Sequence, residues 1–353
     1  MKRVLIVAGG TGGHIFPALA VAEQLLSQGC EVSWLGAKYG LEAKLVPDKF
    51  PMTLMPMRGM RRSGLLAKLF MPWRMLVSLT RAFKIIRKLK PDVVLAMGGY
   101  VAAPAGLAAW LNRVPLVIHE QNAKAGLTNR LLARFAKVRM EAFSGALPGK
   151  GSITIGNPVR KGFLQVPSPE SRYDIKQEKL KILVVGGSQG ARAINRCLIE
   201  TWQRREPLED IQVWHQSGAL DYEEVKSAYA ELPIDAKVEA FIDDMVAAYR
   251  WADLVICRAG ALTISEIATV GVASILIPYP YAADNHQVFN ARYLSDHSAA
   301  TLIQQADVTP AKMEQMLLEA LNDKQSLLKM AQSAKKLAKL EAAEKVADQC
   351  MRC

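Results

Sequence analysis

A strand-like run followed by a glycine-rich turn occurs twice in the chain, and this repeat constrains the fold more than any other feature. Residues 4–8 lead into Gly9-Gly10-Thr11-Gly12-Gly13-His14, and residues 181–185 lead into Gly186-Gly187-Ser188-Gln189-Gly190-Ala191. Unbroken apolar runs of this length are typical of strands buried in a parallel sheet, and a helical pattern follows each turn. The repeat therefore predicts two similar doubly wound α/β domains.

Other segments extend this pattern. Further strand-like runs lie at residues 31–36, 91–97, 115–118, 211–215, 238–241, 254–257 and 273–278. We expect the first helix from about residue 17 to 28, and a long helical segment from about 325 to 348. Residues 164–179 are polar and contain proline, which is typical of a linker.

The charge is divided unequally between the two halves. The 353-residue chain is long enough for two cores. Residues 1–163 carry 24 Lys and Arg against 7 Asp and Glu, a net charge of +17, whereas residues 164–353 carry 21 against 26, a net charge of −5. The two halves are therefore expected to face different partners.

The basic charge is concentrated between residues 49 and 91, which contain eleven Lys or Arg and no acidic residue. Large apolar side chains are interleaved with them: Leu65, Leu66, Leu69, Phe70, Met71, Trp73, Met75 and Leu76. We interpret residues 58–90 as a surface that lies on anionic lipid. A nucleic-acid face would use the same charges, and a helix from about 74 to 89 with a solvated basic face is the third interpretation.

Two features suggest a membrane span or a metal site but have simpler explanations. Residues 93–112 carry no charge, but Gly98, Gly99 and Pro104 favour a strand, a turn and a helix over a spanning helix. Of the five cysteines only Cys350 and Cys353 have a metal or redox spacing, and we expect tail thiols in a reducing cytosol.

The stretch 252–266 has the composition of a phosphate site. An apolar run ends in the small-residue turn Ala259-Gly260-Ala261, and a helical pattern follows from Thr263. A helix that starts here presents unpaired N–H groups at the positive end of its dipole, and Glu266 would lie in its first turn, within reach of ribose hydroxyls. The alternative is structural, because Thr263 and Glu266 also have the spacing of a capping box.

Polar side chains also follow a strand of the first half. His119-Glu120-Gln121-Asn122 ends the run that begins at residue 115, and His14 ends the first glycine turn. Open α/β sheets bind their ligands at the carboxyl ends of the strands, so these groups are expected at a site. The imidazole of a histidine titrates near neutral pH, which suits His14 to a role as general base.

Several motifs together resemble the bacterial MurG transferases of peptidoglycan synthesis, a family with the B-type glycosyltransferase (GT-B) fold. They cover nearly the whole chain in order: residues 9–14, 97–100, 119–122, 156–160, 186–191, 241–245, 259–266 and 284–287. The resemblance implies two parallel-sheet domains that face each other across a cleft. Residues 1–162 with 341–353 would bind acceptor and membrane, and residues 163–340 would bind the donor.

The resemblance also implies the reaction. GlcNAc would pass from UDP-GlcNAc, with inversion, to the C4 hydroxyl of MurNAc in undecaprenyl-pyrophosphoryl-MurNAc-pentapeptide (lipid I), giving lipid II. The enzyme would be peripheral, on the cytoplasmic face of the inner membrane. No cofactor, metal or nucleic acid is expected, and the sequence contains no Asp-x-Asp pair for a metal.

The family pattern assigns roles to particular residues. His14 is the expected base and Glu120 the next candidate. The expected donor contacts are Thr11, Gly12, Gly13, Asn122, Arg160, Ser188, Ile242, Ala261, Leu262, Thr263, Ile264, Ser265, Glu266 and Gln287. Among these, Ile242 would meet uracil through its backbone, Glu266 the ribose, and Ser188 with residues 261–263 the diphosphate.

Other classes fit less of the chain. A UDP-sugar epimerase or hydrolase of the same fold would keep the donor site but has no use for a lipid-facing surface. A nicotinamide oxidoreductase would need a strict GxGxxG and an acid at the end of the second strand, where this chain has Leu35-Gly36. A nucleic-acid binder leaves the polar strand ends unexplained.

Overall fold

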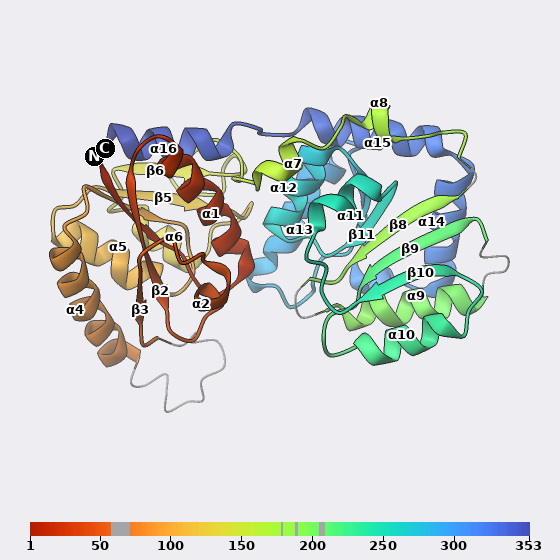
Figure 1. Cartoon of the computed structure of the whole chain (residues 1–353), viewed down its shortest axis with the longest axis horizontal. Helices are drawn as coiled ribbons and strands as arrows, with labels where there is room; N and C mark the ends of the chain where they lie inside the picture. The colour runs from red at the N-terminus through yellow and green to blue at the C-terminus, as the bar shows by residue number, and fades with distance from the viewer. Residues whose placement is uncertain (58–70, 178, 188–189, 205–208) are drawn as a thin grey trace. The chain divides into compact units, whose positions relative to one another are not determined.

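The computed structural model describes residues 1–57, 71–177, 179–187, 190–204 and 209–353. The chain forms two compact units (Figure 1). The N-terminal unit comprises residues 1–160 and 339–353, and the C-terminal unit comprises residues 161–338. Each is an α/β unit around one parallel sheet, so the predicted pair of doubly wound domains is confirmed.

The N-terminal sheet has the strand order β3-β2-β1-β4-β5-β6-β7, all parallel. The chain builds outward from β1 in one direction and then returns to start β4 on the other side. Its switch point therefore lies between the carboxyl ends of β1 and β4. The strands are β1 (Arg3–Val7), β2 (Glu31–Ala37), β3 (Met52–Met55), β4 (Val93–Ala96), β5 (Leu116–Glu120), β6 (Val138–Glu141) and β7 (Ile153–Thr154).

The last helix of the chain belongs to this unit. The helices are α1 (Gly12–Ser27), α2 (Glu42–Leu45), α4 (Met71–Leu89), α5 (Ala102–Leu111), α6 (Leu127–Leu132) and α16 (Ala342–Arg352). Helix α16 packs against α1 (Figure 1). Its Val346, Ala347 and Cys350 are buried in the core formed by β1 and α1. At its end, Lys2 Nζ donates to the carbonyl of Met351 at 2.6 Å.

The C-terminal sheet repeats the same arrangement, with the order β10-β9-β8-β11-β12-β13 and parallel pairing throughout. Its switch point lies between β8 and β11. The strands are β8 (Leu180–Val185), β9 (Ile211–Gln216), β10 (Asp235–Glu239), β11 (Leu254–Cys257), β12 (Ala273–Leu276) and β13 (Thr301–Leu302).

Helices connect these strands. They are α7 (Lys161–Leu164), α8 (Pro169–Arg172), α9 (Arg192–Arg204), α10 (Tyr222–Ala230), α11 (Met245–Trp251), α12 (Ala261–Val270), α13 (His286–Ser295), α14 (Pro310–Asn322) and α15 (Lys324–Lys336), with short 3₁₀ turns at Ala283–Asn285 and Gln305–Asp307.

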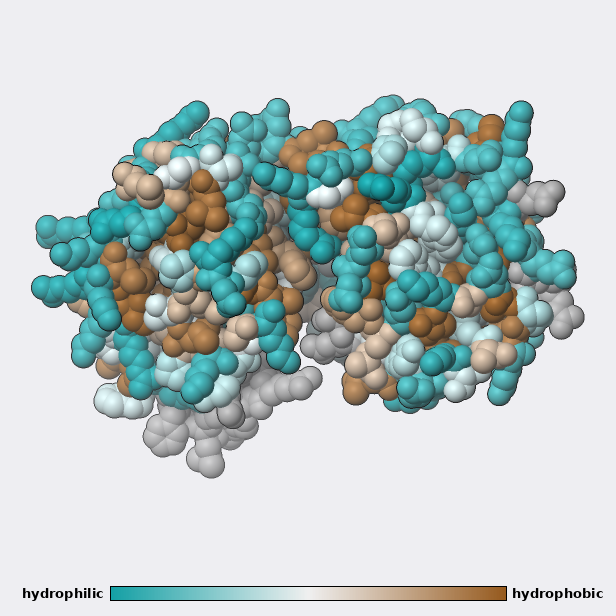
Figure 2. All heavy atoms as spheres, viewed as in Figure 1, coloured by the Kyte–Doolittle hydropathy of each residue, from teal (hydrophilic) through white to brown (hydrophobic). Residues whose placement is uncertain are grey.

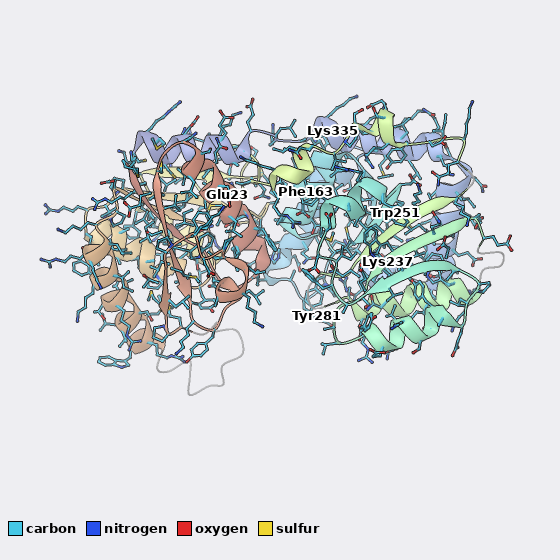
Figure 3. All side chains as sticks on the ribbon, viewed as in Figure 1. Glu23, Phe163, Lys237, Trp251, Tyr281 and Lys335 are labelled. Atoms are coloured by element: carbon cyan, nitrogen blue, oxygen red, sulfur yellow. The ribbon has the colours of Figure 1, made fainter. Side chains whose placement is uncertain are left out.

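The expected linker at residues 164–179 is wrong. This segment packs on the C-terminal unit, because Arg172 Nη2 donates to the carbonyl of Gly271 and Tyr173 Oη donates to that of Asp253, each at 2.6 Å. Just before it, Phe163 of α7 contacts Tyr249 edge-on, with ring centroids 5.5 Å apart (Figure 3). Polar composition and proline here reflect a surface segment that is anchored by two long side chains.

Two helix predictions also need correction. The long segment at 325–348 is two helices, α15 and α16, because each buries its apolar face in a different unit. The first helix starts at Gly12, earlier than expected, because Thr11 is extended and its carbonyl accepts from the N–H groups of His14 and Ile15. His14 therefore stands in the first turn of a helix.

The surface mixes polar and apolar side chains. Figure 2 shows hydrophilic side chains over much of the visible face of each unit, with hydrophobic ones exposed between them. Within the described ranges, no helix combines the length and apolar character needed to cross a membrane. Helix α4 is described from Met71 to Leu89 and includes the predicted helix at 74–89, and the part of the basic segment at 58–70 lies outside the described residues.

A fully buried histidine lies in the core of the C-terminal unit. His215 Nδ1 and Nε2 lie 3.0 Å from Tyr229 Oη and Asn195 Oδ1. Loss of hydration lowers the pKa of His215 to about 3. His119 of the N-terminal unit is equally buried, and its pKa falls to about 4 for the same reason.

Both histidines should make stability depend on pH. At pH 5 the unfolded chain binds protons at histidines of ordinary pKa, near 6.5, whereas the folded chain keeps both imidazoles neutral. The free energy of unfolding should therefore fall by about 2 kcal/mol for each histidine between pH 7.5 and 5. Urea titrations measure this, and the exposed His297→Gln should show the same pH dependence. A stability that is constant over this range would contradict the two assignments.

Candidate functional site

The glycine turn after β1 is packed against a buried carboxylate. Glu42, at the start of α2, is fully buried, and its Oε1 accepts from the N–H groups of Ala37 at 3.0 Å and Gly10 at 3.2 Å. A Cβ on Gly9 would collide with this carboxylate. No sequence pattern marks Glu42, because it lies five residues past the end of β2. The N–H of Gly10 is thus already paired within the protein.

A chain of hydrogen bonds runs from the first turn of α1 to the end of β5. His14 Nδ1 lies 3.0 Å from Gln121 Oε1, and Gln121 Nε2 lies 3.1 Å from His119 Nδ1. His119 Nε2 is 2.9 Å from the carbonyl of Gly156. His119 and Gln121 are buried, whereas His14 is partly exposed. The structure thus brings His14 together with two of the four polar residues at positions 119–122, at the end of β5 and directly after it.

Gly98, at the carboxyl end of β4, makes room for this chain. Its φ is +96°, and a Cβ there would lie 2.8 Å from His14 Nδ1 and 3.3 Å from Gln121 Oε1. Any side chain at this position would strain the backbone and displace the imidazole. The switch point between β1 and β4 is therefore the place where His14 is held.

Glu120 is held by four N–H donors. Oε1 accepts from the backbone and side-chain amides of Asn122 at 2.9 and 3.1 Å. Oε2 accepts from the N–H of Gly126 at 3.2 Å and from Asn129 Nδ2 at 2.9 Å. With 2% of its surface exposed, the carboxylate ties the loop after β5 together. These contacts favour a structural role, and they also occupy the side-chain amide of Asn122.

The other predicted residues of this unit gather around the start of α1. Thr11 and Gly13 are exposed and Gly12 is partly exposed. Arg160 has its guanidinium 5.1 Å from the ring centroid of Phe16. A Cβ on Gly12 would come within 3.0 Å of the same ring. Phe16 thus places Arg160 beside the first turn of α1.

In the C-terminal unit, helix α12 begins at the switch point. Its N-cap is Gly260, which has no side chain to cap the first amides, and the helix starts at Ala261. The predicted capping box is therefore wrong, because Thr263 lies inside the helix and Glu266 falls in its second turn. The predicted residues 261–265 form the beginning of this helix. The first amides of a helix have no intrahelical acceptor, and the dipole favours an anion beside them.

Two polar side chains, the buried Asn290 and the partly buried Arg258, hold the turn before α12. Asn290 Nδ2 donates to the carbonyl of Ala259 at 3.2 Å. Arg258 donates through Nη1 to the carbonyl of Ile277 at 3.1 Å and through Nη2 to Gln305 Oε1 at 2.6 Å. Sequence reasoning missed both residues, because an arginine or asparagine beside a glycine turn carries no pattern of its own. They fix the backbone that presents the helix start.

Three further predicted donor residues, Ile242, Glu266 and Gln287, follow the carboxyl ends of strands of the same sheet. Glu266 is buried, with 7% of its surface exposed. The N–H of Ile242 donates to the side-chain carbonyl of Gln216 at 3.0 Å. The side-chain carbonyl of Gln287 accepts from the N–H of Tyr279 at 2.8 Å. Ser188 lies outside the described residues.

Comparison with known proteins identifies the family. Residues 4–140 match the glycosyltransferase family 28 N-terminal domain, and residues 181–349 match the C-terminal domain. One relative is a protein from Coxiella burnetii (strain RSA 331 / Henzerling II) named UDP-N-acetylglucosamine–N-acetylmuramyl-(pentapeptide) pyrophosphoryl-undecaprenol N-acetylglucosamine transferase. It is 51% identical over 351 residues, which cover 99% of this chain and 98% of the relative. A protein of the same name from Marinobacter nauticus is 44% identical over 99% of this chain and 97% of its own.

The crystal structure of Acinetobacter baumannii MurG matches all of this chain and all of its own, with 40% identity and a TM-score of 0.85. The chain belongs to the MurG family. The match also confirms the predicted GT-B fold. The UDP-GlcNAc 2-epimerase from Neisseria meningitidis is a more distant neighbour, with a TM-score of 0.68 and 11% identity, and this likeness concerns the fold alone.

Replacement of Glu120 separates the two roles considered for it. In Glu120→Gln an amide N–H₂ faces N–H donors, so the loop loses hydrogen bonds and the free energy of unfolding should fall by about 1–3 kcal/mol. The acidic limb of the pH–rate profile should stay where it is in the parent protein. Unfolding titrations and pH–rate profiles measure both. Loss of that limb with unchanged stability would make Glu120 the base.

Proposed function

We propose that this chain is a UDP-GlcNAc-dependent N-acetylglucosaminyltransferase that converts lipid I into lipid II. The observation that carries the proposal is the match, over 99% of the chain, to relatives named for this activity. Both sheet edges support it, because one carries a partly exposed histidine and the other the start of a helix whose N-cap is glycine.

The donor would bind at the carboxyl edge of the C-terminal sheet. The diphosphate would lie at the first amides of α12, residues 261–263, where N–H donors and the dipole stabilise the charge that leaves with UDP. Uracil N3–H would donate to the carbonyl of Ile242, and Glu266 would accept from the ribose hydroxyls. Gln287 would reach the sugar through its amide N–H groups.

The acceptor would bind the N-terminal unit beside His14. The imidazole would take the proton of the MurNAc C4 hydroxyl as its oxygen forms the new bond to C1 of GlcNAc. The bond from C1 to the diphosphate oxygen breaks in the same displacement, so C1 inverts and UDP leaves with the electron pair. Thr11, Gly12, Gly13, Asn122, Arg160 and Ser188 remain predicted donor contacts.

An acceptor that is anchored in the membrane requires a protein surface that contacts the lipid, and we propose that α4 forms part of this surface. Trp73 is 66% exposed and Leu76 51% exposed on this helix. Arg74, Arg81 and Lys84 are exposed on the same helix, which has no acidic residue. Apolar side chains among cations favour the surface of an anionic bilayer, here the cytoplasmic face of the inner membrane.

A UDP-sugar epimerase or hydrolase of the same fold is the alternative. Incubation of the protein with radiolabelled UDP-GlcNAc, with and without lipid I, separates the three activities. The transferase forms labelled lipid II only when the acceptor is present. Epimerised or hydrolysed sugar in the absence of acceptor, with no labelled lipid, would overturn the proposal.

Replacement of Glu266 tests whether this residue contacts the ribose of the donor. Glu266→Ala should weaken UDP binding by about 2–3 kcal/mol, because a carboxylate that accepts from two hydroxyls forms charge-assisted bonds. Glu266→Gln keeps the size of the side chain and should also bind UDP more weakly. Calorimetry measures both, with the exposed Glu319→Gln as the matched control. Parental affinity in Glu266→Gln would exclude the ribose contact.

Replacement of His14 tests its proposed role as the general base. His14→Gln retains a polar side chain but lacks a titratable nitrogen, so kcat should fall by a factor of about 10²–10⁴. UDP affinity should change little, and the acidic limb of the pH–rate profile should disappear. If the limb survives in this variant, another group is the base.

Vesicle sedimentation tests the lipid surface. The protein should bind anionic vesicles, and less so as salt increases. Trp73→Glu should weaken this binding, whereas Leu318→Glu, at an exposed leucine of the C-terminal unit, should not. Equal binding to neutral vesicles at high salt would exclude the electrostatic contribution.

A further inference from the structure

The hydrogen-bond chain behind His14 has only one consistent arrangement of protons. It begins at the carbonyl of Gly156, which can only accept, so His119 Nε2 must carry a hydrogen. His119 is fully buried, and desolvation lowers its pKa to about 4. At neutral pH it therefore holds a single ring proton, on Nε2, and its Nδ1 is an acceptor.

The orientation of the Gln121 amide follows from His119. Gln121 Nε2 lies 3.1 Å from His119 Nδ1 and 3.2 Å from the carbonyl of His119, and both of these atoms are acceptors. The amide nitrogen must therefore face His119, which leaves Oε1 toward His14. Two independent acceptors, His119 Nδ1 and the backbone carbonyl of His119, therefore fix the orientation of this amide.

The proton on His14 is then determined. Gln121 Oε1 can only accept, so His14 Nδ1, 3.0 Å away, must donate. A neutral His14 consequently has its lone pair on Nε2. When Nε2 gains a proton, the Nδ1–H bond to Gln121 is kept and becomes charge-assisted.

Several contacts keep this chain of hydrogen bonds from rearranging. Asn129 Nδ2 donates to the carbonyl of His119 at 3.1 Å, and Asn157 Nδ2 donates to that of Gln121 at 3.0 Å. Gln121 is 1% exposed, so water cannot replace its partners easily. Gly98 leaves room for the His14–Gln121 pair, as described above.

We propose that Gln121 and His119 are positioning residues that fix His14 in the Nδ1–H tautomer, so that Nε2 is the atom that accepts the acceptor's hydroxyl proton. The catalytic meaning of this tautomer rests on the proposed function, in which His14 is the base. In the transfer the O–H bond breaks as the Nε2–H bond forms. A histidine free in water exchanges between two tautomers. Only the Nδ1–H tautomer of His14 places the basic nitrogen, Nε2, on the side of the ring away from Gln121.

Nitrogen-15 NMR of the histidine-labelled, full-length protein tests the tautomer directly at neutral pH without substrate. His14 should carry its proton on Nδ1. His119 and His215 should carry theirs on Nε2, because His215 Nε2 faces the side-chain carbonyl of Asn195, whose amide nitrogen donates to Ser217 and Asp221. A wild-type His14 protonated on Nε2 would overturn the proposal, even if no variant folds.

Two variants at position 121 separate positioning from mere structural support. Gln121→Met keeps the length but removes the amide, so His14 should become a mixture of tautomers and kcat should fall by a factor of about 10, the cost of one hydrogen bond. Gln121→Glu keeps an acceptor toward His14, so the Nδ1–H tautomer should persist. Its negative charge should move the acidic limb of the pH–rate profile to higher pH.

The outcomes also distinguish this inference from the proposed function. Unchanged signals of His215, His286 and His297 would show that the C-terminal unit of each variant is folded. An unchanged His14 tautomer in Gln121→Met, or equal losses of kcat in both variants with no movement of the acidic limb, would contradict the positioning role. Survival of the limb in His14→Gln would instead remove His14 as base and leave the tautomer result intact.

Discussion

The structure depends on the parallel pairing of the strands within each of its two sheets. When every strand runs in the same direction, all carboxyl ends reach one edge, and the connections diverge at the switch point. In the N-terminal unit the edge between β1 and β4 holds His14 and Gly98. In the C-terminal unit the edge between β8 and β11 holds the start of α12. One architectural rule thus supplies both candidate sites.

The two edges differ in their chemistry, although their architecture is the same. The N-terminal edge has a carboxylate, Glu42, behind its glycine turn and a chain of neutral, buried donors and acceptors behind His14. That environment suits proton transfer, and the N–H of Gly10 is already paired with Glu42. The C-terminal edge has a helix start whose N-cap, Gly260, has no side chain that could bond to the first amides. A transferase needs both functions, a base for the acceptor and a stabilised leaving diphosphate.

Much of this was predictable from the sequence, because the strands are unbroken apolar runs and the turns are marked by glycine. The repeat at residues 4–14 and 181–191 predicted two doubly wound domains, and the ordered motifs predicted the family. Side-chain partners were not predictable, since they join residues far apart in the chain. Glu42 reaches Gly10, and His119 reaches Gly156. Helix starts were misplaced where the capping residue was glycine or an extended threonine, as at Gly260 and Thr11.

The central claim is that the nucleotide binds the C-terminal edge while the N-terminal edge supplies the base. Hydrogen–deuterium exchange with and without UDP tests this division most directly. We expect UDP to slow exchange at the amides of residues 261–263, because a diphosphate would accept from them. UDP lacks the sugar of the complete donor, so the amides of residues 9–14, which include the predicted contacts Thr11, Gly12 and Gly13, should exchange at the same rate in both samples. Protection confined to residues 9–14, with none at the start of α12, would contradict the account.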